Sequence, residues 1–407
     1  MTVAIEGSCH PRFQRVRDAF EIAFEKNREV GAAIAFDLDG ENVVDLWAGH
    51  VDKEKTQPWR HDTIVNTYST TKGMTAICAA RLVEQGRLDL DAPVADYWPE
   101  FAQAGKDELP VRYLLSHRAG LPTLRKPMPD ESLYDWEAMT SALAAETPWW
   151  EPGTKQGYHA VTYGFLVGEV IRRVAGRTAG QMFREDIAEP LEADFQIGLP
   201  ASEDGRVSDI IGSILPPKMP KKKADDPDAK SKKTEARIKG PMADFFREMA
   251  DPTTMVGGAF GNPRQRRDAV NTRAWRAAEI PSANGHGNAT ALARIYGTLA
   301  RGGERDGVRI LEKESIDRTR TEQGFEPDLI LGGMKIRYGL GWMLRSQTLP
   351  ATPSPNAFGH AGAGGSLGVA DPDARVGFGY VMNRLKPGLM GGVTAFAALD
   401  AFYAALE

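Results

Sequence analysis

The sequence predicts an α+β fold in which one antiparallel sheet is assembled from both ends of the chain and a mostly helical lobe is inserted between them. Short apolar runs around turns, typical of strands, occur near the N-terminus and again near the C-terminus. The middle of the chain shows mostly helical patterns and loops. We therefore expect a sheet lobe from residues 1–65 and 328–407, with terminal helices, and a helical lobe from residues 66–327.

Each terminal element follows from a local pattern. Residues 11–29 place five apolar side chains on one side of a helix, and GAAIAFDLDGENVVDLWAGHVD, which follows, predicts a β-hairpin. Near the other end, the pattern predicts a strand over 337–344, a strand–turn–strand unit over 365–383 with DPDA as its turn, and a closing helix in GGVTAFAALDAFYAALE.

The inserted lobe shows helical periodicity in segments that are closed or followed by glycine or proline. The expected helices are 71–85, 160–175, 178–188 and 288–301. A further stretch at about 216–240, PPKMPKKKADDPDAKSKKTEARIKG, is rich in lysine, proline and aspartate and has almost no large apolar residues. It cannot contribute to a core, so we expect an exposed, mobile insertion there.

Composition and charge exclude several classes of function. The formal net charge of -5 is small for 407 residues and gives no field that would attract nucleic acid. No stretch has the length and hydropathy of a membrane span or a secretory signal, which favours a cytoplasmic protein. Cys9 and Cys78 form no metal spacing, and the seven histidines include no HExxH, so no metal or other cofactor is expected.

The segment GAGGSLG, residues 362–368, contains a Gly-x-Ser-x-Gly pattern that resembles the nucleophile elbow of an α/β-hydrolase. That elbow needs a strand before the serine, a helix after it and a histidine further along the chain. A second strand is predicted after Ser366, and the last histidine, His360, precedes it. Ser366 is therefore not expected to be a nucleophile.

Ser69 is a better candidate, because it is the only serine followed three positions later by a lysine, Lys72. Apolar residues after Met74 continue a helical rhythm as far as Gly86, which places Ser69 at a helix N-terminus. Free N–H groups and the helix dipole favour negative charge there, and Lys72 returns to the same face one turn later. The alternative is that Ser69 caps the helix and that Lys72 is solvated.

Two further stretches contribute candidate groups. Tyr158 stands after a Pro-Gly turn at the mouth of an apolar helix, where a lysine nearby would favour its phenolate and let it act as a base. His360-Ala361-Gly362 leads into a strand with small residues, and the N–H of Ala363 could pair with that of Ser69 as an oxyanion hole. The alternatives are a packing tyrosine and a glycine-rich turn without a catalytic role.

Ser-x-x-Lys at 69–72, Tyr158 and His-Ala-Gly at 360–362, in this order, resemble the serine β-lactamase and D-Ala-D-Ala peptidase superfamily. The surrounding phrases are most similar to its class C β-lactamase-like carboxylesterases, the family VIII esterases. These phrases are LLSHRAGLP (114–122), EPGT (151–154), PSANGHGNATALARIYGTLARGG (281–303) and GHAGAGGSLGVADP (359–372). The resemblance covers nearly the whole chain except the lysine-rich insertion.

The resemblance implies that Ser69 is the acylated nucleophile, that Lys72 and Tyr158 handle its proton, and that the N–H groups of Ser69 and Ala363 bind the oxyanion. Two departures weaken a β-lactamase activity. The usual Tyr-x-Asn ends here in Ala160, and the usual Lys-Thr-Gly begins here with His360, so an amide and a fixed cation are missing. A His360 that charges near neutrality would keep some preference for anions.

The sequence thus predicts a serine carboxylesterase that acts on small esters of short-chain acids, with weak β-lactam hydrolysis as an additional activity. The alternatives are a β-lactamase, a D-amino-acid peptidase or amidase, an acyltransferase, or a non-catalytic penicillin-binding-like module. His360 and Gly362 are expected to contact the substrate. Further pocket candidates, for each of which buried packing is the alternative, are Tyr113, Trp149, Trp150 and Phe260.

Overall fold

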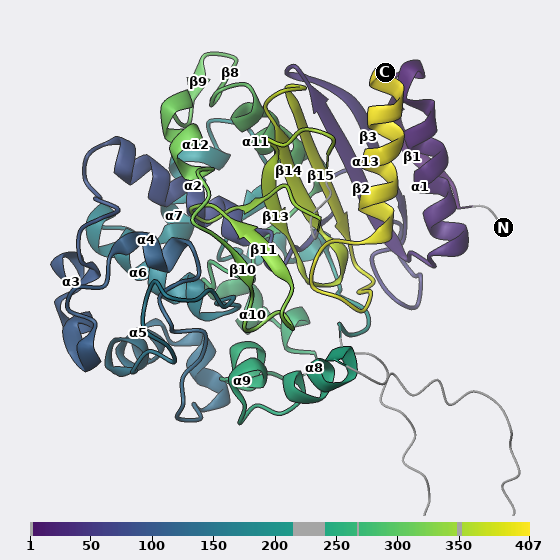
Figure 1. The fold of residues 1–407 in the computed structure, drawn as a ribbon. Helices are drawn as coiled ribbons and strands as arrows, with labels where there is room; N and C mark the ends of the chain where they lie inside the picture. Colours follow the sequence, from purple (N-terminus) through teal and green to yellow (C-terminus); the bar gives the residue numbers. More distant parts are fainter. Residues whose placement is uncertain (1–2, 215–240, 267, 348–351) are drawn as a thin grey trace, which may run out of the picture.

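A nine-stranded antiparallel sheet joins the two ends of the chain, as the sequence predicts (Figure 1). The computed structural model describes residues 3–214, 241–266, 268–347 and 352–407, and the strand order is β1-β3-β2-β15-β14-β13-β12-β11-β10. The strands are β1 (Ile5–Cys9), β2 (Gly31–Leu38), β3 (Glu41–Gly49), β10 (Gly324–Pro327), β11 (Lys335–Tyr338), β12 (Met343–Leu344), β13 (Phe358–Ala361), β14 (Leu367–Asp371) and β15 (Val376–Met382).

The terminal helices α1 (Gln14–Lys26) and α13 (Val393–Leu406) lie side by side against one face of this sheet (Figure 1). Their contact with the sheet is aromatic: the ring of Phe402 stacks on that of Phe36 with centroids 4.1 Å apart. Alternate side chains of a strand point to opposite faces, and β15 offers glycine on the other face. A Cβ on Gly377 would lie 2.2 Å from the Ala293 carbonyl oxygen of α11 (Ala289–Ala300), so glycine permits this helix to pack directly on the sheet.

The remaining helices form a lobe beside the sheet (Figure 1). They are α2 (Thr71–Glu84), α3 (Val94–Tyr97), α4 (Val111–Leu115), α5 (Trp136–Ala145), α6 (Thr162–Ala175), α7 (Ala179–Phe183), α8 (Pro241–Met249), α9 (Met255–Gly261), α10 (Arg273–Ala277) and α12 (Lys313–Thr319). Two small sheets accompany them, one of β4 (Ile64–Asn66), β5 (Phe195–Gln196), β6 (Val207–Ser208) and β7 (His286–Gly287), the other of β8 (Glu304–Arg305) and β9 (Val308–Arg309).

The expected terminal helices and the four expected helices of the middle region are confirmed to within a few residues, but one strand prediction is wrong. Residues 337–344 do not form one strand: the chain turns between β11 and β12, which pair with each other through Tyr338 and Met343. Gly341 adopts a positive φ of 85° in this turn, a conformation that glycine permits. Gly339 and Gly341 interrupt the apolar run in RYGLGWML and are the sequence signal of this turn.

Two expectations about organisation stay predictions. The lysine-rich insertion at about 216–240 lies outside the described residues, and the boundaries of the two lobes are not tested by the contacts. One helix of the middle region, α11, packs on the sheet rather than within the helical lobe.

In the described part of the chain no helix is long and apolar enough to cross a membrane, and the cytoplasmic localisation stays a prediction.

Candidate active site

Ser69 stands at a sharp change of direction between β4 and helix α2. The residue before it, Tyr68, has a φ of +48°, which is the left-handed region and is uncommon for a residue with a side chain. Such strained backbone persists only where its surroundings hold it, and it is concentrated at functional sites. Here the Thr71 hydroxyl donates a hydrogen bond to the Tyr68 carbonyl at 2.5 Å and accepts one from the Gly285 N–H at 2.8 Å. These bonds fix the turn, and Ser69 remains half-buried.

Lys72 is fully buried, and its amine meets three oxygen atoms. Its Nζ lies 3.2 Å from Ser69 Oγ, 2.7 Å from the Ala160 carbonyl oxygen and 3.0 Å from the Ser282 carbonyl oxygen. The predicted proximity of Lys72 to Ser69 is therefore present, and the alternative of a solvated lysine is wrong. The sequence could not identify the two carbonyls, because every residue has a carbonyl and only the fold selects these two.

The surroundings of Lys72 favour its neutral amine. Burial lowers the pKa of Lys72 well below the ordinary lysine value, and none of the groups around Nζ is an anion. A neutral amine has two N–H donors and one lone pair. When the carbonyls of Ala160 and Ser282 accept both N–H groups, the lone pair is left for the Ser69 hydroxyl, and Lys72 can take the proton of Ser69.

Tyr158 packs over the amine of Lys72, with Nζ 4.6 Å from the centroid of its ring. Burial raises the pKa of Tyr158 above its ordinary range, which outweighs the opposing effect of a hydrogen bond with Ser69. The expected phenolate is therefore not supported: with a neutral amine as its neighbour, Tyr158 remains a neutral phenol. As a phenol it can donate a proton but is a poor base at neutral pH.

A buried carboxyl that the sequence analysis did not single out, Asp328, holds the backbone before Tyr158. Its Oδ1 accepts hydrogen bonds from the N–H groups of Tyr158 (3.1 Å), Ile330 (2.8 Å) and Leu331 (2.9 Å), and Oδ2 accepts one from the Tyr338 hydroxyl at 3.0 Å. Burial raises the pKa of Asp328, against the effect of these donors. The only sequence signal was one acid within an apolar stretch, which is too common to identify such a group.

The end of strand β13 reaches the Ser69 turn through Gly362 and Ser366. Ser366 Oγ donates a hydrogen bond to the Thr67 carbonyl at 2.7 Å and lies 3.1 Å from the Thr70 hydroxyl. A Cβ on Gly362 would lie 2.3 Å from the same Thr67 carbonyl oxygen. The turn of the protein thus occupies the space on the Cβ side of Gly362, and the expected contact of Gly362 with substrate stays a prediction. Ser366 is a buried link between strand and turn.

Replacing Gly362 with alanine is expected to lower both stability and activity. The added Cβ would meet backbone that cannot move without shifting Ser69, and overpacking of this kind costs about 1–3 kcal/mol of unfolding free energy. Gly205→Ala is the matched control, since a Cβ there meets nothing within 4 Å. Urea unfolding and ester turnover of both variants check this, and equal behaviour of the two would contradict the packing described.

The two backbone N–H groups expected to form the oxyanion hole are without acceptors in the described residues. Within the described residues, the N–H groups of Ser69 and Ala363 donate to no acceptor, whereas the neighbouring N–H of Gly362 is bonded to the Ser366 carbonyl at 2.8 Å. Free donors at a helix start and at a strand end are the groups that an oxyanion requires. The packing of Gly362 on Thr67 brings the strand end that carries Ala363 to the turn that carries Ser69.

This arrangement can be compared with known proteins. The family model named Beta-lactamase matches residues 16–402. The chain belongs to the beta-lactamase family. It is 38% identical to the esterase/beta-lactamase LipL of Mycobacterium tuberculosis (strain ATCC 25618 / H37Rv) over 93% of this chain and 83% of that protein.

Solved structures of the beta-lactamase family superpose on this chain over nearly its whole length. A family VIII carboxylesterase superposes with a TM-score of 0.86 at 40% identity, covering 99% of this chain and all of that one. EstA from Arthrobacter nitroguajacolicus Rue61a superposes with a TM-score of 0.82 at 31% identity, covering 100% and 99%. The resemblance inferred from the sequence is confirmed, and the chain is an esterase/beta-lactamase-like serine hydrolase.

The histidines of the two motif segments, His159 and His360, are both buried. His159 is a core residue, since its Nε2 accepts a hydrogen bond from the Leu121 N–H at 3.0 Å and its Nδ1 donates to the Gly157 carbonyl at 2.7 Å. His360 Nδ1 lies 2.7 Å from the Ala361 carbonyl oxygen, and burial lowers the pKa of His360 to about 3. His360 is neutral at pH 7, so the expected preference for anions is not supported.

The aromatic pocket candidates in this beta-lactamase-family enzyme fall into two groups. Trp149 donates to the Thr123 carbonyl at 2.9 Å, Trp150 packs against Gly157, and Tyr113 packs against Gly153, so packing accounts for all three. Phe260 lines a cavity whose lining also includes Tyr68, the residue before Ser69. The geometry therefore favours Phe260 over the two tryptophans as a contact for substrate.

Proposed function

We propose that this protein is a serine carboxylesterase that hydrolyses esters of short-chain carboxylic acids through an acyl-enzyme on Ser69. The observation that carries the proposal is the buried Lys72 amine, 3.2 Å from Ser69 Oγ and held by two carbonyls that leave its lone pair for the serine. The names of similar proteins, an esterase/beta-lactamase and a family VIII carboxylesterase, support it. A module that only recognises a ligand has no need of a neutral buried lysine.

In the first half of the reaction, Lys72 takes the proton of Ser69 while Oγ attacks the ester carbonyl carbon. The N–H groups of Ser69 and Ala363 stabilise the charge that develops on the carbonyl oxygen. Tyr158 then gives its proton to the departing alkoxide as the bond to the alcohol breaks. The ammonium of Lys72 returns a proton to Tyr158, over whose ring it lies.

In the second half, water attacks the acyl carbon and the bond to Ser69 Oγ breaks. Lys72, neutral again, takes the proton of the attacking water, and the serine oxygen recovers a proton as the acid leaves. This assignment makes Lys72 the base and Tyr158 the acid of the first half, because burial moves their pKa values in opposite directions.

The cavity next to Ser69 supports a small acyl group. Its volume is about 170 Å³, below the ~300 Å³ at which pockets for drug-sized ligands begin. The cavity lining includes Tyr68, Val161 and Ala283. Each of these residues adjoins a residue of the site in the chain: Ser69, Ala160 and Ser282, respectively. The other lining residues are mostly apolar: Leu133, Phe260, Pro263, Gln265, Arg266, Ala269, Val270, Trp275 and Ile280. We propose that this cavity holds the acyl chain.

Changing the size of this cavity is expected to change the preferred acyl length. Phe260→Ala should favour longer chains, by about 0.8 kcal/mol, or roughly fourfold in kcat/KM, for each added CH₂ that becomes buried. Val270→Phe should favour acetate esters, because it fills the cavity. The measurement is kcat/KM on p-nitrophenyl acetate, butyrate and octanoate.

Trp149→Phe is the control for these variants, because Trp149 lies outside the cavity lining. It is expected to leave the ratio between the three esters unchanged. If Trp149→Phe shifts the chain-length preference and Phe260→Ala does not, the acyl group lies elsewhere.

A comparison of substrates tests the function itself. Turnover of a short-chain p-nitrophenyl ester, a chromogenic cephalosporin, a D-Ala-D-Ala peptide and a D-amino-acid amide separates the esterase from a β-lactamase, a peptidase and an amidase. Adding a primary alcohol as a second acceptor reveals acyl transfer. We expect the ester to be turned over fastest, because the site lacks the amide and the cation that grip the other substrates. A higher kcat/KM on the cephalosporin or the peptide would overturn the proposal.

A further inference from the structure

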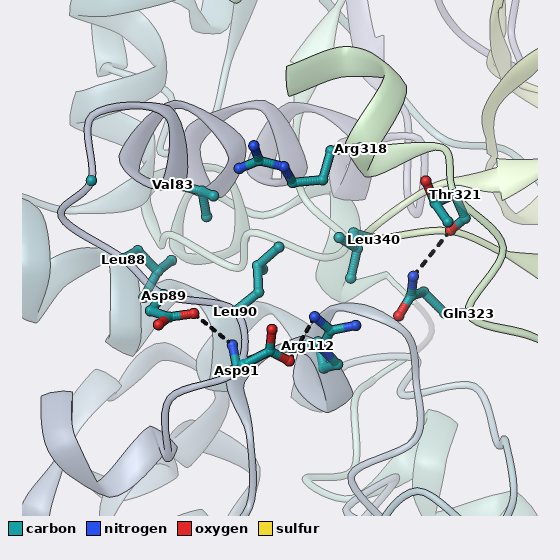
Figure 2. A pocket seen from close by; sticks show the side chains of 11 residues that line it. Val83, Leu88, Asp89, Leu90, Asp91, Arg112, Arg318, Thr321, Gln323 and Leu340 are labelled. Atoms are coloured by element: carbon teal, nitrogen blue, oxygen red, sulfur yellow. Dashed lines mark hydrogen bonds and ion pairs between the residues drawn. The ribbon is translucent and has the colours of Figure 1, made fainter. Parts of the chain in front are cut away.

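A second cavity, of about 520 Å³, is lined in part by residues from the C-terminal end of helix α2 (Figure 2). Its lining includes Val83 and Gly86 at the C-terminal end of that helix, whereas Ser69 precedes its first turn. Fourteen helical residues separate the two by about 20 Å, so this cavity is not part of the site described above. Its volume lies within the range that small-molecule sites occupy.

The cavity has an apolar floor and a polar mouth. Val83, Leu88, Leu90 and Leu340 form the floor, and the side chain of Arg318 from α12 extends across it (Figure 2). The remaining lining residues are polar or small: Gly86, Asp89, Asp91, Arg112, Thr321 and Gln323. A ligand that fits both parts has a charged or polar head and a short apolar tail.

Among the charged side chains of the lining, Arg318 is a cation without an ion-pair partner in the described part of the chain, and Asp89 is a carboxylate without one. Arg112 pairs with Asp91 at 2.6 Å, and Asp89 Oδ1 accepts a hydrogen bond from the Asp91 N–H at 2.9 Å. The guanidinium of Arg318 forms neither a hydrogen bond nor an ion pair with any residue that the structure describes. An exposed arginine beside apolar side chains matches a carboxylate, which it can bind through two N–H groups at once.

The floor of the cavity continues into a small void. An apolar void that shares Val83, Leu90, Arg318 and Leu340 with the cavity continues inward to Ala76, Ala80 and Leu115. Its volume of about 10 Å³ is near the minimum for one water molecule, and its walls are almost wholly apolar, which makes it a dry void.

We propose that this cavity is a binding site for small amphiphilic carboxylates, with the carboxylate on Arg318 and the alkyl chain against Leu90 and Leu340. Carboxylates of this class are also what hydrolysis of short-chain esters releases. The proposal stands on the shape and charge of the cavity and does not depend on the activity at Ser69.

Calorimetric titration of the full chain with hexanoate tests the proposal. Arg318→Gln should weaken binding by about fivefold or more, since it removes the lining cation that no described carboxylate pairs with. Thr321→Glu should also weaken the binding of hexanoate, because it places a carboxylate at the mouth that repels the carboxylate of the ligand. Lys313→Gln, on the same helix but outside the cavity, is the control and should leave the affinity unchanged.

Two related ligands test the head and the tail separately. Acetate should bind about tenfold or more weakly than hexanoate, because it lacks the buried CH₂ groups. Hexylammonium should not compete. The proposal is overturned if hexanoate does not bind at up to 50 mM, a concentration of the order used for weak ligands. It is also overturned if hexylammonium binds as tightly, or if neither Arg318→Gln nor Thr321→Glu changes the affinity.

Discussion

Replacing Ser69 with alanine is expected to lower kcat/KM on a short-chain p-nitrophenyl ester by about 10⁴-fold or more, a loss typical of removing a nucleophile that works with its base. The loss arises because, among the described residues, Ser69 carries the hydroxyl that hydrogen-bonds to Lys72 Nζ, and the other hydrogen-bond partners of Nζ there are two carbonyl oxygens. Folding should be retained, since Ser69 is half-buried and its side chain packs little. Steady-state kinetics with circular dichroism as a folding control provide the measurement.

Ser366→Ala is the matched serine control. Ser366 links strand β13 to the Ser69 turn through its bonds to Thr67 and Thr70, so its loss should cost about 1–2 kcal/mol of unfolding free energy. Activity of the folded variant should fall by less than about tenfold, which corresponds to 1.4 kcal/mol. The reverse pattern, an active Ser69→Ala and an inactive Ser366→Ala, would contradict the proposed mechanism.

Replacing Lys72 with methionine is expected to lower kcat by about 10³-fold, within the range that general acid–base groups contribute. Methionine has a similar length and no charge, so it fills the buried space that Lys72 occupies. It cannot accept the proton of Ser69, and it leaves the carbonyls of Ala160 and Ser282 without their donor. Single-turnover kinetics should show the loss in both acylation and deacylation, because Lys72 is the base of both half-reactions.

The pH dependence of the wild type follows from the same lysine. The protonated amine is inactive, so kcat/KM should rise with pH as Lys72 loses its proton, and burial sets the midpoint well below the ~10.4 of an ordinary lysine. Lys72→Met should lack this rise. A wild-type profile that continues to climb up to the ordinary lysine pKa would contradict the neutral amine.

The sequence predicted the elements of the site that depend on local periodicity. Ser69 and Lys72 lie one helical turn apart, so any helix that begins near Ser69 brings them together, and the two side chains are found 3.2 Å apart. Asn288 likewise was interpreted as the start of a helix, and its side chain caps α11 by accepting from the Ala291 N–H at 2.8 Å. Both inferences needed only neighbouring residues.

The features that the sequence missed depend on long-range contacts. The carbonyls of Ala160 and Ser282 meet Lys72 only after α2, the start of α6 and the segment before β7 have packed together. No local pattern shows that the Thr67 carbonyl would approach Gly362. The protonation state of Tyr158 could not be predicted from the sequence either, because it depends on burial.

Labelling with an active-serine phosphonate, followed by digestion and mass spectrometry, tests the central proposal most directly. The phosphonate forms a stable bond to an activated serine oxygen and so reports which hydroxyl the enzyme activates. We expect one adduct, on the peptide that contains Ser69, formed in step with the loss of esterase activity and absent from Ser69→Ala. An adduct on Ser366, or full inactivation with Ser69 unmodified, would contradict the account.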